Sequence, residues 1–199
     1  MTLYCATTNS GKLREFREAG ERFGEGRIVV ERLPAMKEIS APEETGSTFE
    51  ENAILKAVYY SRFVDGPLFA DDSGLEVAAL GGAPGVYSAR FAGPEATDEA
   101  NNVLLLERLR GLEDRSGQFV CVIALARCGE LVKTFRGEVR GTILEAPRGS
   151  NGFGYDPLFY YPPFGCTFGE AGLPQKMEVS HRAQALAAMF QWLPNFTSA

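Results

Sequence analysis

The sequence has a single histidine, His181, and no Cys-x-x-Cys pair among its four cysteines. Structural zinc sites are built mainly from closely spaced cysteines and histidines, so a zinc site of that kind is nearly excluded. The four cysteines are Cys5, Cys121, Cys128 and Cys166; they are widely separated, and three of them lie in or beside apolar runs. We therefore expect reduced thiols in or near the core.

Long apolar runs and blocks of basic residues are also missing. No run approaches the roughly 20 residues that a membrane-spanning helix needs, and the N-terminus enters a strand-like segment at Leu3 without a basic leader. We therefore expect a cytoplasmic protein with no membrane partner. The net charge is −6, and without a cluster of Lys or Arg we expect no nucleic-acid partner.

Apolar residues make up 45% of the 199-residue chain, which predicts a folded protein with a real core. Strand-like runs lie at 3–7, 28–33, 68–70, 75–80, 119–126 and 131–139, and helical patterns lie at 12–23, 48–63, 97–109 and from 180 onward. Some strands alternate with helices, whereas the turn between the last two predicts a hairpin. This mixture predicts an α/β fold with a mixed sheet.

Two adjacent carboxylates, Asp71 and Asp72, follow the apolar run 68–70 and precede Ser73. The carboxyl ends of strands are where α/β proteins bind ligands, and carboxylate and hydroxyl oxygens suit Mg²⁺. Acid-acid-Ser-Gly is equally good turn chemistry, so a solvated turn is the alternative.

Residues 8–11 form a Gly/Asn/Ser turn between the first strand and the first helix, and Lys12 follows. Unpaired N–H groups and the helix dipole make such a turn a ready anion site. It is not a P-loop, because Ala6 stands at the position of the first glycine and Leu13 follows the lysine. The alternative is a helix that one of the turn residues merely caps.

Cations recur at two helices. Asn52 and Lys56 align on one side of the helix 48–63, for which Ser47 and Glu50 fit a capping box; the alternative is a solvated face.

His181 and Arg182 occupy the first turn of the last helix, where the dipole disfavours positive charge. Cations there suggest a function, and the alternative is an exposed pair of little energetic effect.

The glycine-rich loop 147–154 leads into Phe153-Gly154-Tyr155-Asp156-Pro157. Aromatic rings that flank a glycine can stack on a nucleobase, because every base has a π face. Packing against the neighbouring strand is the alternative.

Six blocks occur in one order: Thr7-Thr8-Asn9-Ser10-Gly11-Lys12, Glu43-Glu44-Thr45-Gly46 with Phe49 and Asn52-Ala53-Ile54-Leu55-Lys56, Ala70-Asp71-Asp72-Ser73-Gly74, Gly81-Gly82-Ala83-Pro84-Gly85 with Tyr87-Ser88-Ala89-Arg90, Phe153-Gly154-Tyr155-Asp156-Pro157, and Ser180-His181-Arg182. Together they closely resemble the inosine triphosphate pyrophosphatase family, hydrolases of dITP, ITP and XTP that clear the nucleotide pool. The resemblance runs from residue 3 to the last helix.

The resemblance implies a single domain over residues 1–199, with an elongated, two-lobed α/β fold. A long mixed central sheet flanked by helices would carry the active site in a cleft between the lobes. It also implies a homodimer and a Mg²⁺ cofactor. The implied reaction is NTP + H₂O → NMP + pyrophosphate, by in-line attack of water at the α-phosphorus.

The resemblance also implies the site residues. Asp72 would be the catalytic, metal-linked carboxylate that activates water, and Ser73 would lie beside the substrate. The metal ligands would be Asp72 and Glu43, rather than Glu44. The triphosphate would be bound by Thr7, Thr8, Asn9, Ser10, Gly11, Lys12 and Lys56. The base and sugar would be surrounded by Phe153, Gly154, Tyr155, Asp156, Lys176, His181 and Arg182.

Two other functions fit the same residues. Relatives of this fold that resemble septum-formation inhibitors would act on pyrimidine or methylated nucleotides. A nucleotide sensor would use the same turn and lysines without turnover, although a pure binder of a polyanion has little reason to place two carboxylates beside the phosphates.

Overall fold

The computed structural model describes residues 1–196, in which the chain forms two compact units. The first unit contains Met1–Asp72, Cys121–Gly137 and the chain from His181 onward. The second contains Ser73–Val120 and Glu138–Ser180. That one domain spans residues 1–199 stays a prediction, and residues 197–199 lie outside the described part of the chain.

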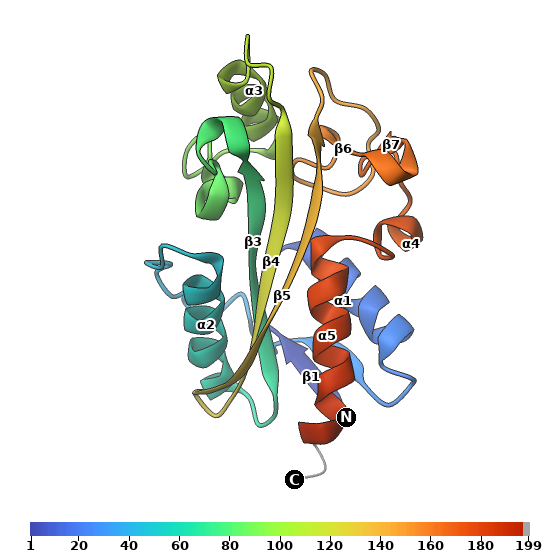
Figure 1. The fold of residues 1–199 in the computed structure, drawn as a ribbon. Helices are drawn as coiled ribbons and strands as arrows, with labels where there is room; N and C mark the ends of the chain where they lie inside the picture. Colours follow the sequence, from blue (N-terminus) through green and yellow to red (C-terminus); the bar gives the residue numbers. More distant parts are fainter. Residues whose placement is uncertain (197–199) are drawn as a thin grey trace. The chain divides into compact units, whose positions relative to one another are not determined.

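Across residues 1–196, seven strands form one sheet in the order β2-β1-β3-β4-β5-β6-β7 (Figure 1). The strands are β1 (Thr2–Cys5), β2 (Val29–Arg32), β3 (Leu68–Val77), β4 (Ser116–Arg127), β5 (Glu130–Ile143), β6 (Phe159–Tyr161) and β7 (Cys166–Thr167). β1 pairs in parallel with β2 and β3, whereas β6 pairs antiparallel with β5 and β7. The predicted α/β fold with a mixed sheet is confirmed.

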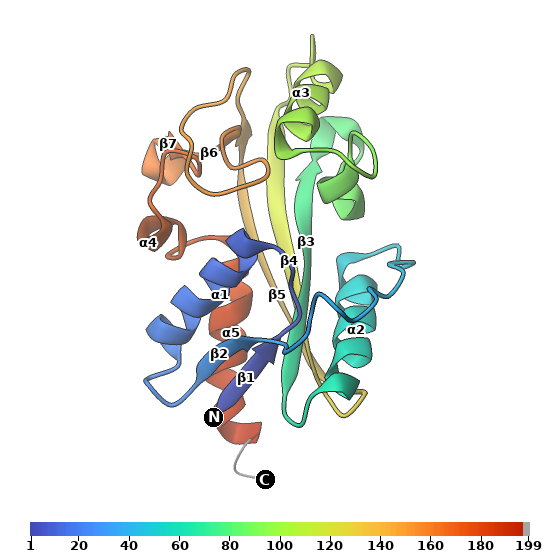
Figure 2. The same cartoon turned by 180° about the vertical axis from the view of Figure 1, so that it is seen from behind.

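Helices cover both faces of the sheet in the first unit. α1 (Ser10–Phe23) and α5 (His181–Phe196) pack side by side on one face, and α2 (Phe49–Tyr60) lies on the other (Figure 2). The ring of Phe16 in α1 meets that of Phe69 in β3 edge to face, with centroids 4.9 Å apart. Burial on both faces explains why β3 begins as a continuous apolar run.

The start of α2 differs by one residue from the prediction. Thr48, not Ser47, is the N-cap: its hydroxyl accepts the N–H of Glu51, whose carboxylate accepts the N–H of Thr48 in return. Ser47 donates its own N–H and hydroxyl to the same carboxylate. The predicted capping box of Ser47 and Glu50 is therefore wrong by one position, because three donors converge on Glu51.

The second unit has its own apolar core, in which α3 (Asp98–Arg108) packs through Leu105 against β3 and β4 residues such as Leu75 and Phe119. The ring of Phe119 lies 4.5 Å from that of Phe159, centroid to centroid. The remaining helical segments are the short helix α4 (Leu173–Lys176) and the 3₁₀ turns Ser61–Phe63, Ala78–Leu80, Gly85–Arg90 and Pro162–Phe164. Among the described residues, no helix combines the length and apolarity needed to cross a bilayer.

Candidate active site

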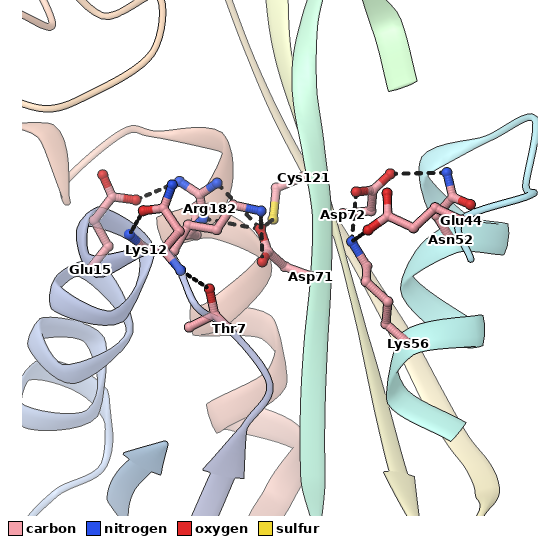
Figure 3. Close-up of polar contacts among 11 residues, drawn as sticks. Thr7, Lys12, Glu15, Glu44, Asn52, Lys56, Asp71, Asp72, Cys121 and Arg182 are labelled. Atoms are coloured by element: carbon pink, nitrogen blue, oxygen red, sulfur yellow. Dashed lines mark hydrogen bonds and ion pairs between the residues drawn. The ribbon is translucent and has the colours of Figure 1, made fainter. Parts of the chain in front are cut away.

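The acid pair lies inside β3, which runs unbroken from Leu68 to Val77. Asp71 and Asp72 are only 3% and 7% exposed. The expected strand end at residue 70 and the alternative of a solvated turn are therefore both wrong. Since successive residues of a strand point to opposite faces, the two carboxylates are presented to different sides of the sheet (Figure 3).

Asp71 faces α1 and α5 (Figure 3). Lys12 Nζ lies 3.0 Å from both of its carboxylate oxygens, and Arg182 donates Nε and Nη2 to Oδ2 at 3.3 Å. The thiol of Cys121 donates to Oδ2 at 3.9 Å. Burial by itself raises the pKa of Asp71, but the charges of Lys12 and Arg182 outweigh it and hold that pKa well below its ordinary value.

Arg182 is the buried centre of this group. Its Nη1 donates to Glu15 Oε2 at 2.5 Å, so the guanidinium joins two carboxylates from α1 and β3. Burial lowers the pKa of Arg182, but Glu15 and Asp71 raise it further, and the side chain stays charged. The alternative of an exposed pair at the start of α5 is therefore wrong, since His181 and Arg182 are both buried.

Asp72 faces α2. Lys56 Nζ donates to its Oδ1 at 2.8 Å, and Asn52 Nδ2 lies 3.4 Å from its Oδ2. Burial raises the pKa of Asp72, and Lys56 counteracts this effect only in part. The alternative of a solvated face is wrong, because Asn52 is fully buried and Lys56 is held by carboxylates.

Asn52 also fixes the segment that precedes α2. Its Oδ1 accepts the N–H of Gly46 at 2.8 Å, and its Nδ2 donates to the Gly46 carbonyl at 3.3 Å. A side chain at position 46 would collide with Asn52 and Glu51. This segment carries Glu44, whose Oε1 lies 3.1 Å from Lys56 Nζ.

The arrangement bears on which glutamate could hold a metal. The carboxylates of Glu44 and Asp72 both reach Lys56 Nζ, so they converge on one point, whereas Glu43 is exposed. Among residues 1–196, no three Asp, Glu, His or Cys side chains gather as ligands. Mg²⁺ is commonly bound by one or two carboxylates together with substrate phosphates, so the pair of Asp72 and Glu44 fits this ion.

The first turn has the predicted form, a strand followed by a helix N-terminus. Asn9 is the N-cap of α1, and its Oδ1 accepts the N–H of Lys12 at 2.9 Å. Thr7 Oγ1 in turn accepts the N–H of Asn9 at 3.1 Å. The turn is therefore capped and also brings Lys12 to Asp71; Thr8, Ser10 and Gly11 lie in or beside the first helical turn.

The second unit brings together Phe153, Asp156 and Lys176. Lys176 Nζ donates to Asp156 Oδ2 at 2.5 Å and lies 5.0 Å from the centroid of the Phe153 ring. The same Oδ2 accepts the N–H of Phe153 at 3.0 Å. Tyr155 does not offer a free stacking surface. Its ring is buried, as the packing alternative predicts, and its hydroxyl donates to the Ser88 carbonyl at 2.8 Å.

The predicted site residues thus fall into two groups, each described within its own unit. The first unit holds residues 7–12, Lys56, Asp72, His181 and Arg182, and the second holds Ser73, residues 153–156 and Lys176. The position of the nucleotide stays a prediction. Sequence reasoning missed Glu15, although a carboxylate between the apolar Leu13 and Phe16 was a usable signal.

Comparison with known proteins identifies the family. The model described as the Ham1 family matches residues 3–192. The dITP/XTP pyrophosphatase of Acidobacterium capsulatum is 51% identical over 203 residues, which cover 98% of each chain. That of Thermus thermophilus is 49% identical over 193 residues, covering 96% of this chain and 91% of the relative.

A solved structure agrees with the sequence matches. The Ham1 protein of Staphylococcus aureus superposes with a TM-score of 0.85 at 40% identity, covering 98% of this chain and 99% of the other. The family resemblance predicted from the six sequence blocks is confirmed. The chain belongs to the Ham1 family.

Proposed function

We propose that this protein hydrolyses non-standard purine nucleoside triphosphates, namely dITP, ITP and XTP, to the monophosphate and pyrophosphate, and so removes them from the nucleotide pool. The observation that carries the proposal is the buried pair Asp71 and Asp72, each held by its own lysine. Relatives about half identical over nearly the whole chain carry the name dITP/XTP pyrophosphatase. Burying charged carboxylates and lysines costs desolvation free energy, and a site that binds and processes phosphates gives a reason to keep them there.

The triphosphate belongs with the cations of the first unit. In the proposal, the turn of residues 7–12 offers N–H groups at the start of α1, and Lys12 and Lys56 supply positive charge. Phosphoryl transfer depends mainly on positioning and on electrostatic stabilisation of charge that develops on the leaving group. Both lysines are part-buried, so their charges are less screened than at an open surface.

Mg²⁺ is the proposed cofactor, with Asp72 and Glu44 as its protein ligands. When bound, the ion would neutralise phosphate charge and make a bound water more acidic. The geometry favours Glu44 over Glu43, because only Glu44 shares Lys56 with Asp72. The positive charge of Lys56 offsets the repulsion between these two carboxylates.

Asp72 is the proposed general base. It would take a proton from the water that attacks the α-phosphorus, and its orientation is set by Lys56 and Asn52. Burial raises its pKa toward the working pH, which makes it a better proton acceptor than an ordinary aspartate. Ser73, next along β3, is proposed to lie beside the substrate.

Base recognition is proposed for the second unit. The ring of Phe153 offers a stacking surface, and Lys176 places an ammonium near it, with Asp156 as its carboxylate partner. A hydrogen-bond donor beside this ring would pair with the O6 acceptor of hypoxanthine or xanthine, whereas the N6 amine of adenine offers it no acceptor. Gly154 and Tyr155 shape this loop.

Arg182 is proposed for a different task from the one first expected. Its guanidinium joins Asp71 and Glu15, so reading a base would require these contacts to break. We assign it to positioning: Arg182 orients Asp71, and Asp71 in turn holds the ammonium of Lys12. A homodimer and a cytoplasmic location are proposed on the family resemblance and are tested by light scattering and by cell fractionation.

The test is to incubate the protein with ITP and Mg²⁺ and to measure pyrophosphate. In ¹⁸O-water, label in IMP identifies attack at the α-phosphorus, whereas label only in orthophosphate identifies an ordinary phosphatase. A panel with dITP, XTP, dUTP, dTTP and GTP separates purine from pyrimidine substrates. Tight binding of ITP without any product would identify a sensor and overturn the proposal.

A further inference from the structure

In the second unit, residues 152–156 form the loop that carries Phe153. Gly152 and Gly154 have φ angles of +74° and +61°, in the left-handed region that favours glycine. One side of this loop is already part of the proposed base site, because Asp156 accepts hydrogen bonds from the Phe153 N–H and from Lys176. Glycines on both sides of Phe153 leave its orientation dependent on outside contacts.

The other side of the loop is held by α3. The N–H of Gly154 donates to Asp98 Oδ2 at 2.6 Å, and its carbonyl accepts from Asn102 Nδ2 at 3.0 Å. Asp98 and Asn102 lie one turn apart on α3, so they share a helix face. Both backbone polar groups of a single residue are thereby fixed, which sets the peptide planes on each side of it. We call these two hydrogen bonds the Gly154 clasp.

Neither residue of the clasp caps its helix. Thr97 is the N-cap of α3, and its hydroxyl accepts the N–H of Ala100 at 3.2 Å, so Asp98 is not used as a cap. The Oδ1 of Asn102 is buried and has no hydrogen-bond partner among the described residues. A buried acceptor without a partner costs stability. The hydrogen bond that Asn102 Nδ2 donates to the Gly154 carbonyl is therefore the contact that explains an asparagine at this position.

We infer that Asp98 and Asn102 are positioning residues for base recognition, and this inference rests on the function proposed above. The clasp fixes Gly154, and through it the neighbouring Phe153 ring, beside which Lys176 lies. Without the clasp, the glycine-flanked loop regains conformational freedom that must be lost again on binding. Binding of the base becomes weaker and less selective, while the groups that act on the triphosphate are untouched.

The test compares Asp98→Ala and Asn102→Ala with the wild type in steady-state hydrolysis of ITP and GTP. Each variant is expected to raise the KM for ITP about tenfold, to reduce the preference for ITP over GTP, and to change kcat by less than about threefold. Asp98→Asn keeps an acceptor for the Gly154 N–H and restores most of the loss. Asn102→Asp turns a carboxylate toward the Gly154 carbonyl and exceeds the defect of Asn102→Ala.

Glu99→Ala is the matched control, because it removes a carboxylate from the same helical turn at an exposed position outside the clasp. It loses the same favourable interaction with the helix dipole but is expected to leave KM and base preference unchanged. Hydrogen exchange of residues 147–158 gives a readout independent of activity, and Asp98→Ala and Asn102→Ala should each accelerate it about tenfold relative to Glu99→Ala.

The outcomes separate this inference from the proposed function. If Asp98→Ala and Asn102→Ala lower thermal stability as Glu99→Ala does, yet leave KM, base preference and loop exchange unchanged, the clasp is only structural and the inference is overturned while the function stands. If the wild type releases no pyrophosphate from ITP, dITP or XTP, the proposed function fails and this inference fails with it. Should Asp98→Ala not fold, Asn102→Ala and Asn102→Asp decide the result.

Discussion

Asp71 and Asp72 are neighbours in β3, yet Asp71 binds Lys12 on one face of the strand and Asp72 binds Lys56 on the other, at 3.0 and 2.8 Å. The charge of Lys12 nevertheless lowers the pKa of Asp72, and that of Lys56 lowers the pKa of Asp71. The two faces therefore form one electrostatic cluster. Their pKa values are shifted in opposite directions, which suits a fixed anion on one side and a proton acceptor on the other.

Asp72→Asn should lower kcat sharply. Loss of a general base typically costs about 10²- to 10⁴-fold in kcat. Burial raises the pKa of Asp72 in the folded state, so the contribution of Asp72 to the free energy of unfolding is complete at low pH and is lost as the pH rises through that pKa. Asn does not ionise. In EDTA, the stability of Asp72→Asn relative to that of the wild type should therefore increase as the pH rises from 4 to 8.

Pyrophosphate release and thermal melts at several pH values measure both effects. Asp65→Asn is the control, since Asp65 is an exposed acid in the same unit. Near-native turnover of Asp72→Asn at saturating Mg²⁺ would remove Asp72 from the role of base.

Glu44→Gln and Glu43→Gln should behave differently. Removing even an outer partner of a metal ligand costs about 10- to 100-fold in metal affinity, so loss of Glu44 should raise the Mg²⁺ concentration for half-maximal rate at least tenfold. Glu43→Gln, a change one position away at an exposed residue, should leave that concentration unchanged. Titrations of Mg²⁺ at fixed ITP decide between them, and the reverse pattern would assign the metal to Glu43.

Arg182→Ala should unfold the protein at a much lower temperature. Removing one partner of a buried ion pair costs about 3–5 kcal/mol, because Glu15 and Asp71 are left as buried charges. Arg140→Ala, at a guanidinium on the surface, is the control and should have little effect.

Arg182→Lys tests whether Arg182 reads the base. It should lower stability and kcat, because an ammonium cannot join both carboxylates in the same geometry. The preference for ITP over ATP should stay the same. A narrowed preference in Arg182→Lys, measured at a temperature where it is folded, would return Arg182 to base reading.

Brief alkylation of the native protein should modify Cys128 at least about a hundredfold faster than Cys5 or Cys121. Cys128 is exposed, whereas Cys5 and Cys121 are fully buried. Burial raises the pKa of Cys5 to about 12, so almost none of it is the reactive thiolate at pH 8. Peptide mass spectrometry after treatment with iodoacetamide measures the rates, with the denatured protein as the control in which all the thiols react.

The fold was predictable from local patterns, and the acid pair shows where such patterns stop. Apolar runs and helical periodicity place β1, α1, α2 and α5 nearly where the structure has them. Asp71 to Gly74 reads as a turn because its local propensity is turn-like, yet the segment is held extended by Lys12, Lys56 and Arg182 from distant parts of the chain. The Arg182 partner Glu15 lies 167 residues away in the sequence.

The choice between Glu43 and Glu44 shows the same limit at short range. Adjacent residues of one loop have nearly identical local signals, and only the path of the backbone decides which reaches Lys56. The six blocks together nevertheless identified the family, because their order carries information that no single block holds.

The grip of Asn52 on Gly46 has a consequence for how this protein tolerates insertions. Glu44 lies two residues before the anchored glycine, so its reach is set by a short, pinned stretch of chain. The loop ahead of that stretch, residues 40–43, can lengthen or shorten mainly at the cost of loop entropy, which grows only slowly with length. Single-residue deletions before Glu44 in this loop should therefore leave activity largely intact, whereas deletions between Glu44 and Gly46 should abolish it.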